Sequence, residues 1–339
     1  MISNILKKGK DILAGLLVCI VIALIAQGIA HFVPSIGSAL IAIVIGIIAG
    51  NTFLGQPVLD KGTKFSESRL LEISIVLMGL TLNLTDIMGV GFGGVGFIIL
   101  QMTGTIIAAC LIGKLLGFGR RFSLLMSAGN AVCGSSAIGT VAPVVGADSK
   151  EKGISITIVN VTGTVLMVLL PALAGLLYHH ETLHTAGLIG GTLQSIGQVI
   201  ASAKFVNDEV VELSTVFKII RIIFLVFVAL VFAKANTDDT KPFFSKKQHT
   251  NAHVKAGIPW FIIGFFLLSV VTSFGIVPQF LSHGAKLVSN QFEIIALAAI
   301  GMRVKFRDLV QEGPKAMLYG GMVGACQILL AVLLIFILF

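Results

Sequence analysis

Val216-Phe217-Lys218-Ile219-Ile220-Arg221-Ile222-Ile223-Phe224 is apolar enough for the interior of a lipid bilayer, yet two cations interrupt it. Each cation costs about 2.5–3.5 kcal/mol near the centre of a membrane helix. Lys218 and Arg221 are three residues apart and therefore share one helix face. Paired cations at this depth are typical of a water-filled path or an anion site. A structural ion pair with Glu212 or Glu293 is the competing interpretation.

The composition of the whole chain agrees with this stretch. Of its 339 residues, 56% are hydrophobic and 12% are charged, and the mean hydropathy is +1.00. A soluble domain carries about 25% charged residues. The 38 glycines are typical of packed membrane helices. We therefore expect an all-α polytopic membrane protein without a soluble portion large enough for an enzyme.

Apolar runs of roughly 20 residues, or fewer where a segment is broken, predict about eleven transmembrane segments. They comprise residues 12–32, 36–50, 70–84, 94–116, 122–146, 153–177, 186–203, 213–233, 257–276, 283–302 and 316–339. The chain then divides into a cytoplasmic N-terminus (1–11), segments one to eight (12–234), a basic cytoplasmic linker (235–256) and segments nine to eleven (257–339). Short or glycine-interrupted segments, such as the second, third and seventh, point to a transporter binding site.

The lysines and arginines between these segments predict the orientation. With the N-terminus inside, the inside loops hold 18 of them and the outside loops hold 4, namely Lys150, Lys152, Lys204 and Lys286. This split predicts a cytoplasmic N-terminus and an extracytoplasmic C-terminus. The net charge of +8 then reflects orientation and does not indicate a nucleic-acid partner.

Residues 127–140 place glycines, hydroxyls and the amide of Asn130 in the middle of a predicted segment. Gly134 would let a helix unwind there, and Ser135 or Ser136 could cap the half-helix that restarts. The free amides and the dipole at such an N-terminus suit an anion. A continuous helix packed through its small residues is the alternative.

Three further side chains are candidates for a site. Gln194 and Gln198 are four residues apart on one face of a second glycine-rich segment and could orient an oxyanion or cross-link helices. Glu293 is the deeper of the two carboxylates in the apolar segments, so it is the candidate for ion coupling. No metal site, cofactor motif or nucleotide motif is present, and we expect no enzymatic activity.

Two internal echoes suggest a repeat. Residues 79–87 match residues 301–309 in pattern, and the predicted topology gives them opposite orientations, as in the inverted repeats of secondary transporters. A weaker echo links residues 136–138 with residues 198–200. Eleven crossings would give these two stretches the same orientation, which conflicts with a simple inverted repeat.

Several of these stretches resemble one bacterial family, the YeiH-like membrane proteins, which carries a sulfate-exporter label. The matching pieces are Gly129-Asn130-Ala131-Val132-Cys133-Gly134-Ser135-Ser136-Ala137-Ile138, Pro143, Gly190-Gly191, Gln198-Val199, Lys218-x-x-Arg221, Ile258-Pro259-Trp260-Phe261 and Gly301-Met302-x-Val304-x-Phe306. That family is similar to the superfamily of cation/proton antiporters and bile-acid-type anion transporters. The resemblance implies a panel domain and a mobile core domain with crossed, discontinuous helices. Gln194 departs from it, because members often have His there.

We therefore expect a secondary active transporter of a small inorganic or sulfur-containing anion such as sulfate, with alternating access around a midplane site. The expected site residues are Asn130, Gly134, Ser135, Ser136, Gln194, Gln198, Lys218 and Arg221. The expected partners are the anionic solute and the lipid bilayer, and the oligomeric state stays open. The alternatives are a cation/proton antiporter of the same architecture, which would use Glu293, and a non-transporting membrane sensor or scaffold.

Overall fold

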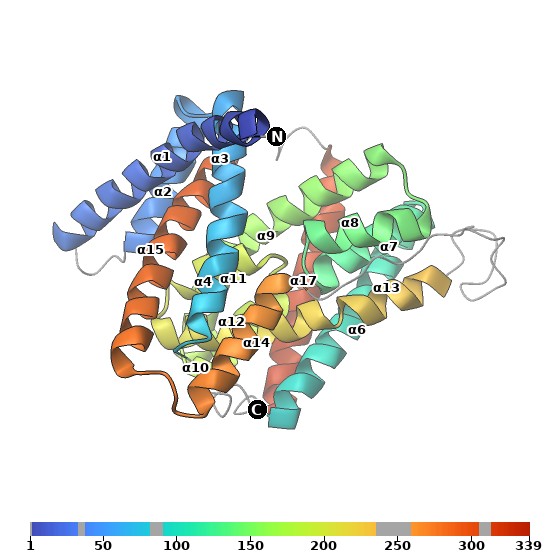
Figure 1. Cartoon of the computed structure of the whole chain (residues 1–339). Coiled ribbons are helices and arrows are strands. Elements are labelled where there is room, and N and C mark those ends of the chain that lie inside the picture. The colour runs from blue at the N-terminus through green and yellow to red at the C-terminus, as the bar shows by residue number, and fades with distance from the viewer. Residues whose placement is uncertain (1, 33–37, 82–90, 235–258, 305–312) are drawn as a thin grey trace. The chain divides into compact units, whose positions relative to one another are not determined.

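The computed structural model of the chain consists of helices joined by turns (Figure 1). It describes residues 2–32, 38–81, 91–234, 259–304 and 313–339. No strand occurs in these ranges, so the all-α prediction is confirmed for them. The predicted linker at 235–256 and most of the stronger internal echo lie outside the described residues.

Contacts divide the chain into two compact units, each built from two separate stretches of sequence. Unit 1 comprises Met1–Gly89 and Pro259–Phe306. Its helices are α1 (Ile2–Phe32), α2 (Ser38–Thr52), the 3-10 helix η1 (Pro57–Leu59), α3 (Asp60–Phe65), the π-helix η2 (Ser66–Leu70), α4 (Leu71–Met78), α14 (Trp260–Ser273) and α15 (Gln279–Arg303).

Unit 2 comprises Val90–Ile258 and Arg307–Phe339. Its helices are α6 (Gly91–Leu115), α7 (Arg120–Ala131), α8 (Ser135–Val145), α9 (Ser149–Tyr178), α10 (Thr182–Thr192), α11 (Ile196–Ala203), α12 (Asp208–Ile223), α13 (Leu225–Lys234) and α17 (Pro314–Leu338). Every predicted apolar segment therefore coincides with one helix or with two consecutive helices.

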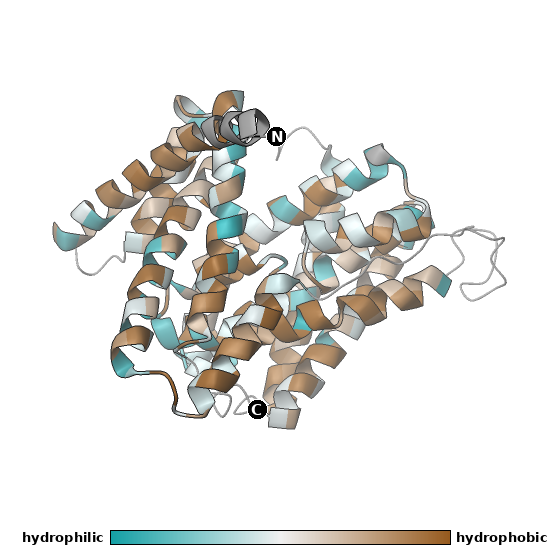
Figure 2. Cartoon of the chain, in the orientation of Figure 1, coloured by the Kyte–Doolittle hydropathy of each residue, from teal (hydrophilic) through white to brown (hydrophobic). Residues whose placement is uncertain are grey.

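Six stretches of the described helices are long and apolar enough to cross a membrane. They are Ile12–Phe32, Gly91–Leu115, Lys150–Tyr178, Asp208–Lys234, Gln279–Arg303 and Pro314–Leu338. Figure 2 shows apolar residues along most of α1 and α6, and large apolar side chains on such helices are exposed, for example Leu111 and Phe336. Lipid is the solvent that covers such surfaces. The chain is therefore a multi-pass membrane protein.

Unit 1 is held together by close packing of helix backbones. Gly46 and Gly50 of α2, four residues apart, lie against the α15 backbone at Ala298 and Met302. Small residues at this spacing let membrane helices approach closely. In addition, Ser289 of α15 donates a hydrogen bond to the Ser74 carbonyl of α4.

Three long helices give unit 2 its frame. α6 and α17 are antiparallel, because Gln101 Nε2 donates to the Gln327 carbonyl (2.9 Å) and Tyr319 Oη donates to the Ala109 carbonyl (2.6 Å). α9 is parallel to α17, because Thr162 lies against both Gly320 and Gly324, and the ends of these two helices come together beyond it. α6 stops at the end of the unit where α7, α9 and α17 start, and we call this the Arg120 end. The opposite end is the Thr182 end.

Candidate functional site

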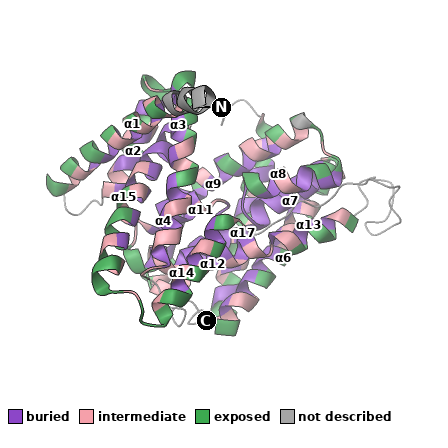
Figure 3. Ribbon diagram, viewed as in Figure 1, coloured by how far each residue is buried: buried purple, intermediate pink, exposed green. Residues whose placement is uncertain are grey.

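The helices α7 and α8 form a hairpin whose tip lies inside unit 2. Gly129 lies against the side chain of Ile138, although nine residues along one continuous helix would separate them by about 13 Å. The chain turns at Gly134, whose φ of 65° and ψ of −128° are open almost only to glycine. The α8 helix then returns to the Arg120 end, because only three residues join it to α9. Residues 122–131 of α7 are wholly buried (Figure 3).

The helices α10 and α11 form a second hairpin. At its base, Thr182 Oγ1 lies 3.4 Å from Glu209 Oε2, so α10 and α12 start side by side. At its tip, Lys218 of α12 donates to the Leu193 carbonyl that follows α10. These contacts make α10 parallel to α12. Because only four residues join α11 to α12, α11 must run back from the tip to the Thr182 end.

The two hairpins therefore enter unit 2 from opposite ends and meet at their tips. The predicted break in segment 122–146 is confirmed. Segment 186–203 is broken as well, so the expectation that Gln194 and Gln198 share one helix face is wrong, because Gln194 lies between α10 and α11. Neither segment crosses the unit, so the expectation of eleven crossings and of crossed helices is corrected. The error arose because a hairpin of two half-helices has the same apolar length as one crossing. It also removes a conflict, since the echoing residues 136–138 and 198–200 now run in opposite directions.

Lys218 bridges the two tips. It is fully buried, and its Nζ donates to the Val132 carbonyl (2.5 Å) in the first tip and to the Leu193 carbonyl (2.7 Å) in the second. One ammonium group thus satisfies a carbonyl of each hairpin.

Arg221 makes the same connection with more bonds, and only 1% of it is exposed. In the first tip, Nε donates to the Ala131 carbonyl (3.0 Å) and Nη2 donates to the Asn130 carbonyl (2.7 Å). In the second tip, Nη1 donates to the carbonyls of Gly190 (3.2 Å) and Leu193 (2.9 Å). The planar guanidinium suits such a set of fixed acceptors.

These acceptors explain why two cations lie so deep. Carbonyls at the C-terminal ends of α7 and α10 lack partners within their own helices, and each helix end carries a partial negative charge. Lys218 and Arg221 supply donors to these carbonyls. In the described residues, their hydrogen bonds go to backbone carbonyls and neither forms an ion pair with Glu212 or Glu293. Direct contact with an anion stays a prediction.

A network of buried amides lies beside the cations. Gln194 Nε2 donates to Asn130 Oδ1 (3.1 Å) and Gln327 Oε1 (3.2 Å), so it joins the two tips to α17. Gln327 Nε2 donates in turn to the carbonyls of Asn130 (3.0 Å) and Thr192 (3.3 Å). Gln327 and its α6 neighbour Gln101 were not among the residues predicted from the sequence. The signal was available, because each is an amide within an apolar run.

Gln198 caps α11. The Ser195 hydroxyl accepts from the Gln198 backbone N–H (3.1 Å), and Gln198 Oε1 accepts from the Ser195 N–H (3.0 Å). This reciprocal pair is a capping box. Gln198 Nε2 also donates to the Asn160 carbonyl (3.3 Å). The N-terminal end of α11 is therefore satisfied within the protein.

The N-terminal end of α8 has no side-chain cap. Its N-cap is Gly134, which has no side chain to accept from the helix amides, so the prediction that Ser135 or Ser136 caps this helix is wrong. Both serines are exposed. The Ser136 hydroxyl donates back to the Cys133 carbonyl (3.0 Å). The first amides of α8 therefore have no side-chain cap, unlike those of α11.

The carboxylate predicted for coupling is not among these residues. Glu293 belongs to α15 of unit 1, where it is buried with Oε1 3.3 Å from Ser289 Oγ. The tips belong to unit 2. In the described ranges, no group of three or more His, Cys, Asp or Glu side chains could hold a metal ion.

Comparison with known proteins places the chain in a family. A family profile described as Conserved hypothetical protein 698 matches residues 14–320. A UPF0324 membrane protein of Clostridium perfringens is 57% identical over 335 residues, which cover 99% of this chain and 98% of that protein. The chain belongs to the UPF0324 family of membrane proteins. This is the YeiH-like family, so the resemblance seen in the sequence is confirmed.

Other UPF0324 proteins match over nearly the same length. The one from Lactiplantibacillus plantarum is 45% identical over 329 residues, which cover 97% of this chain and 98% of the relative. UPF0324 membrane protein YdhF of Lactococcus lactis is 44% identical over 335 residues, with 96% and 98% covered. All three relatives are named membrane proteins, in agreement with the apolar helices.

Proposed function

We propose that this UPF0324 protein is a secondary active transporter, not an enzyme, that carries a small inorganic or sulfur-containing anion such as sulfate. One observation carries the proposal. Lys218 and Arg221 lie fully buried between the tips of two opposed hairpins, and no described carboxylate pairs with either of them.

The charges at the tips favour an anion. Each C-terminal helix end contributes about −0.5 charge and each N-terminal end about +0.5. The ends of α7 and α10 are therefore balanced by the starts of α8 and α11, and the two side chains leave a net charge of about +2. An unbalanced buried charge is costly, so a bound anion would stabilise this region and a bound cation would not.

The start of α8 is the place where the anion would bind. Its uncapped amides and the exposed hydroxyl of Ser135 are donors suited to an oxyanion. A hydrogen bond to a charged group contributes about 1.5–3 kcal/mol, so several must act together to replace the water around a dianion. We therefore expect modest affinity.

Hairpins from opposite ends also suit alternating access. Movement of the α7–α8 tip would open the site toward the Arg120 end, and movement of the α10–α11 tip would open it toward the Thr182 end. The sequence contains no nucleotide motif, so a gradient of solute or ions would drive transport.

A negative charge introduced at Ser135 tests this site. In proteoliposomes, Ser135→Asp should lower the uptake of labelled sulfate at least about tenfold, because its carboxylate would occupy the amides and repel the anion. Ser135→Asn introduces a neutral side chain of nearly the same shape as Asp and should keep most of the uptake. An acidic residue in the first turn of a helix stabilises it by about 0.3–1 kcal/mol, so unfolding would not explain a loss.

Two outcomes would contradict the proposal. Equal uptake by the Asp and Asn variants would show that the start of α8 does not bind the anion. No flux of sulfate, thiosulfate or sulfite through the wild-type protein would reject transport of this class and favour a sensor or scaffold.

A further inference from the structure

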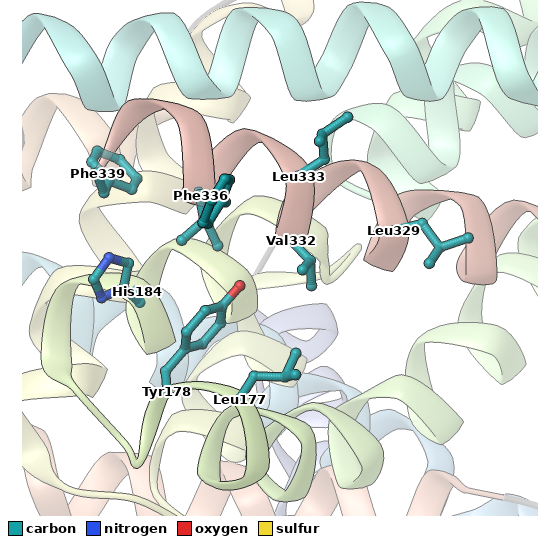
Figure 4. A pocket seen from close by; sticks show the side chains of 9 residues that line it. Leu177, Tyr178, His184, Leu329, Val332, Leu333, Phe336 and Phe339 are labelled. Atoms are coloured by element: carbon teal, nitrogen blue, oxygen red, sulfur yellow. The ribbon is translucent and has the colours of Figure 1, made fainter.

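A cavity lies at the Thr182 end of unit 2 (Figure 4). Its volume is about 580 Å³, within the range of pockets that hold small molecules. It is bounded by the last residues of α9, the first turn of α10 and the last turns of α17. Its walls are apolar, with Leu177, Val332 and Phe336 among them, and only Tyr178 and His184 contribute polar side chains.

The cavity borders the lipid. Leu333 and Phe336 line it and are 55% and 86% exposed on a helix that is apolar enough to cross a membrane. The apolar stretch of α9 ends at Tyr178. Tyrosine at the end of a membrane helix marks the level of the lipid headgroups. The polar end of the cavity is therefore at headgroup level, and its apolar walls extend toward the hydrocarbon.

One polar atom in this cavity lacks a partner. The Tyr178 hydroxyl oxygen is buried and makes no hydrogen bond to any described residue. Leaving a buried hydroxyl unpaired is unfavourable. In Figure 4 the Tyr178 side chain points from α9 toward α17. Its ring stacks on His184 at 5.3 Å, and His184 Nδ1 pairs with the Glu181 carboxylate, so these contacts hold the hydroxyl in this direction.

We infer that the cavity binds one acyl chain of a membrane phospholipid, whose ester carbonyl accepts a hydrogen bond from the Tyr178 hydroxyl. The apolar walls exclude a hydrated solute, so this site is distinct from the anion site at the hairpin tips. A phospholipid supplies an apolar chain that fits the apolar walls. It also supplies an acceptor oxygen at the boundary of the hydrocarbon, which the Tyr178 hydroxyl lacks.

Retention of lipid during purification tests the inference. Protein extracted from membranes of defined phospholipid composition is washed with increasing detergent, and bound lipid is counted by native mass spectrometry. The wild-type protein should keep one phospholipid after the annular lipid is gone. Val332→Phe fills the cavity and should abolish this retention. Tyr178→Phe removes only the hydroxyl and should weaken it roughly two- to tenfold, as expected for one hydrogen bond.

Ile337→Phe is the matched control, because Ile337 is an exposed apolar residue of α17 outside the cavity lining. It should retain lipid like the wild type. The inference is overturned if the wild type keeps no lipid, if it keeps a free fatty acid instead, or if Tyr178→Phe retains phospholipid as well as the wild type does. The Tyr178 variant keeps the test decisive even if Val332→Phe does not fold.

Discussion

Arg221 shows how a residue that is costly in a membrane can hold a fold together. Its side chain binds four backbone carbonyls from two hairpins. A lysine has three donors on a single nitrogen, so it could not reproduce contacts that spread over three nitrogens. The role of Arg221 therefore depends on the shape of the guanidinium as well as on its charge.

Replacing Arg221 with Lys should lower the free energy of unfolding by about 1.5–3 kcal/mol, because at least one charged hydrogen bond is lost. Thermal unfolding in detergent, followed by circular dichroism, measures the effect. Arg69→Lys is the control, since Arg69 is exposed and pairs with Glu72 at the surface, where such a pair contributes about 0–1 kcal/mol. Equal melting of both variants would show that the carbonyl contacts do not stabilise the tips.

At the scale of the elements, the α7–α8 hairpin depends on one backbone conformation. Gly134 has a positive φ, and a Cβ there would meet Gln194 no closer than 3.6 Å. The space would accept alanine, so any penalty comes from the backbone. The sequence showed that a break occurs here. It did not show the direction in which the chain leaves the break.

Gly134→Ala should therefore destabilise the protein by about 1–3 kcal/mol, the typical cost of a strained residue. Gly139→Ala is the matched control within α8. Its Cβ would meet no atom within 4 Å, and alanine is favoured over glycine in a helix by about 0.5–1 kcal/mol. The melting temperature should fall for Gly134→Ala and rise for Gly139→Ala. A rise or no change for Gly134→Ala would contradict the hairpin turn.

At the scale of the whole molecule, the hairpins change the membrane topology. The turn between α8 and α9 lies at the Arg120 end, which the predicted orientation places inside. Lys150 and Lys152, predicted to be outside, are therefore counted with the inside loops. The inside loops then hold 20 lysines and arginines rather than 18, and the outside loops hold 2 rather than 4. This distribution follows the positive-inside rule more closely than eleven crossings do.

Single cysteines can test this topology in a variant lacking the four native cysteines, Cys19, Cys110, Cys133 and Cys326. Asp208→Cys, at the Thr182 end, should react in intact cells with a maleimide that cannot cross the membrane. Lys150→Cys, at the Arg120 end, should react only after permeabilisation. Eleven crossings predict that both react from outside, so labelling of both in intact cells would contradict the hairpins.

Composition and local pattern were enough to predict an all-helical membrane protein, the positions of its apolar segments and the break at Gly134. Those features depend on composition and on local backbone freedom, which neighbouring residues in the chain set. Tertiary contacts were needed to show that the broken segments fold back, that Lys218 and Arg221 bind carbonyls, and that Gln327 joins both tips. These features depend on contacts between residues up to 197 positions apart, and the length and hydropathy of a segment are the same whether it crosses or returns.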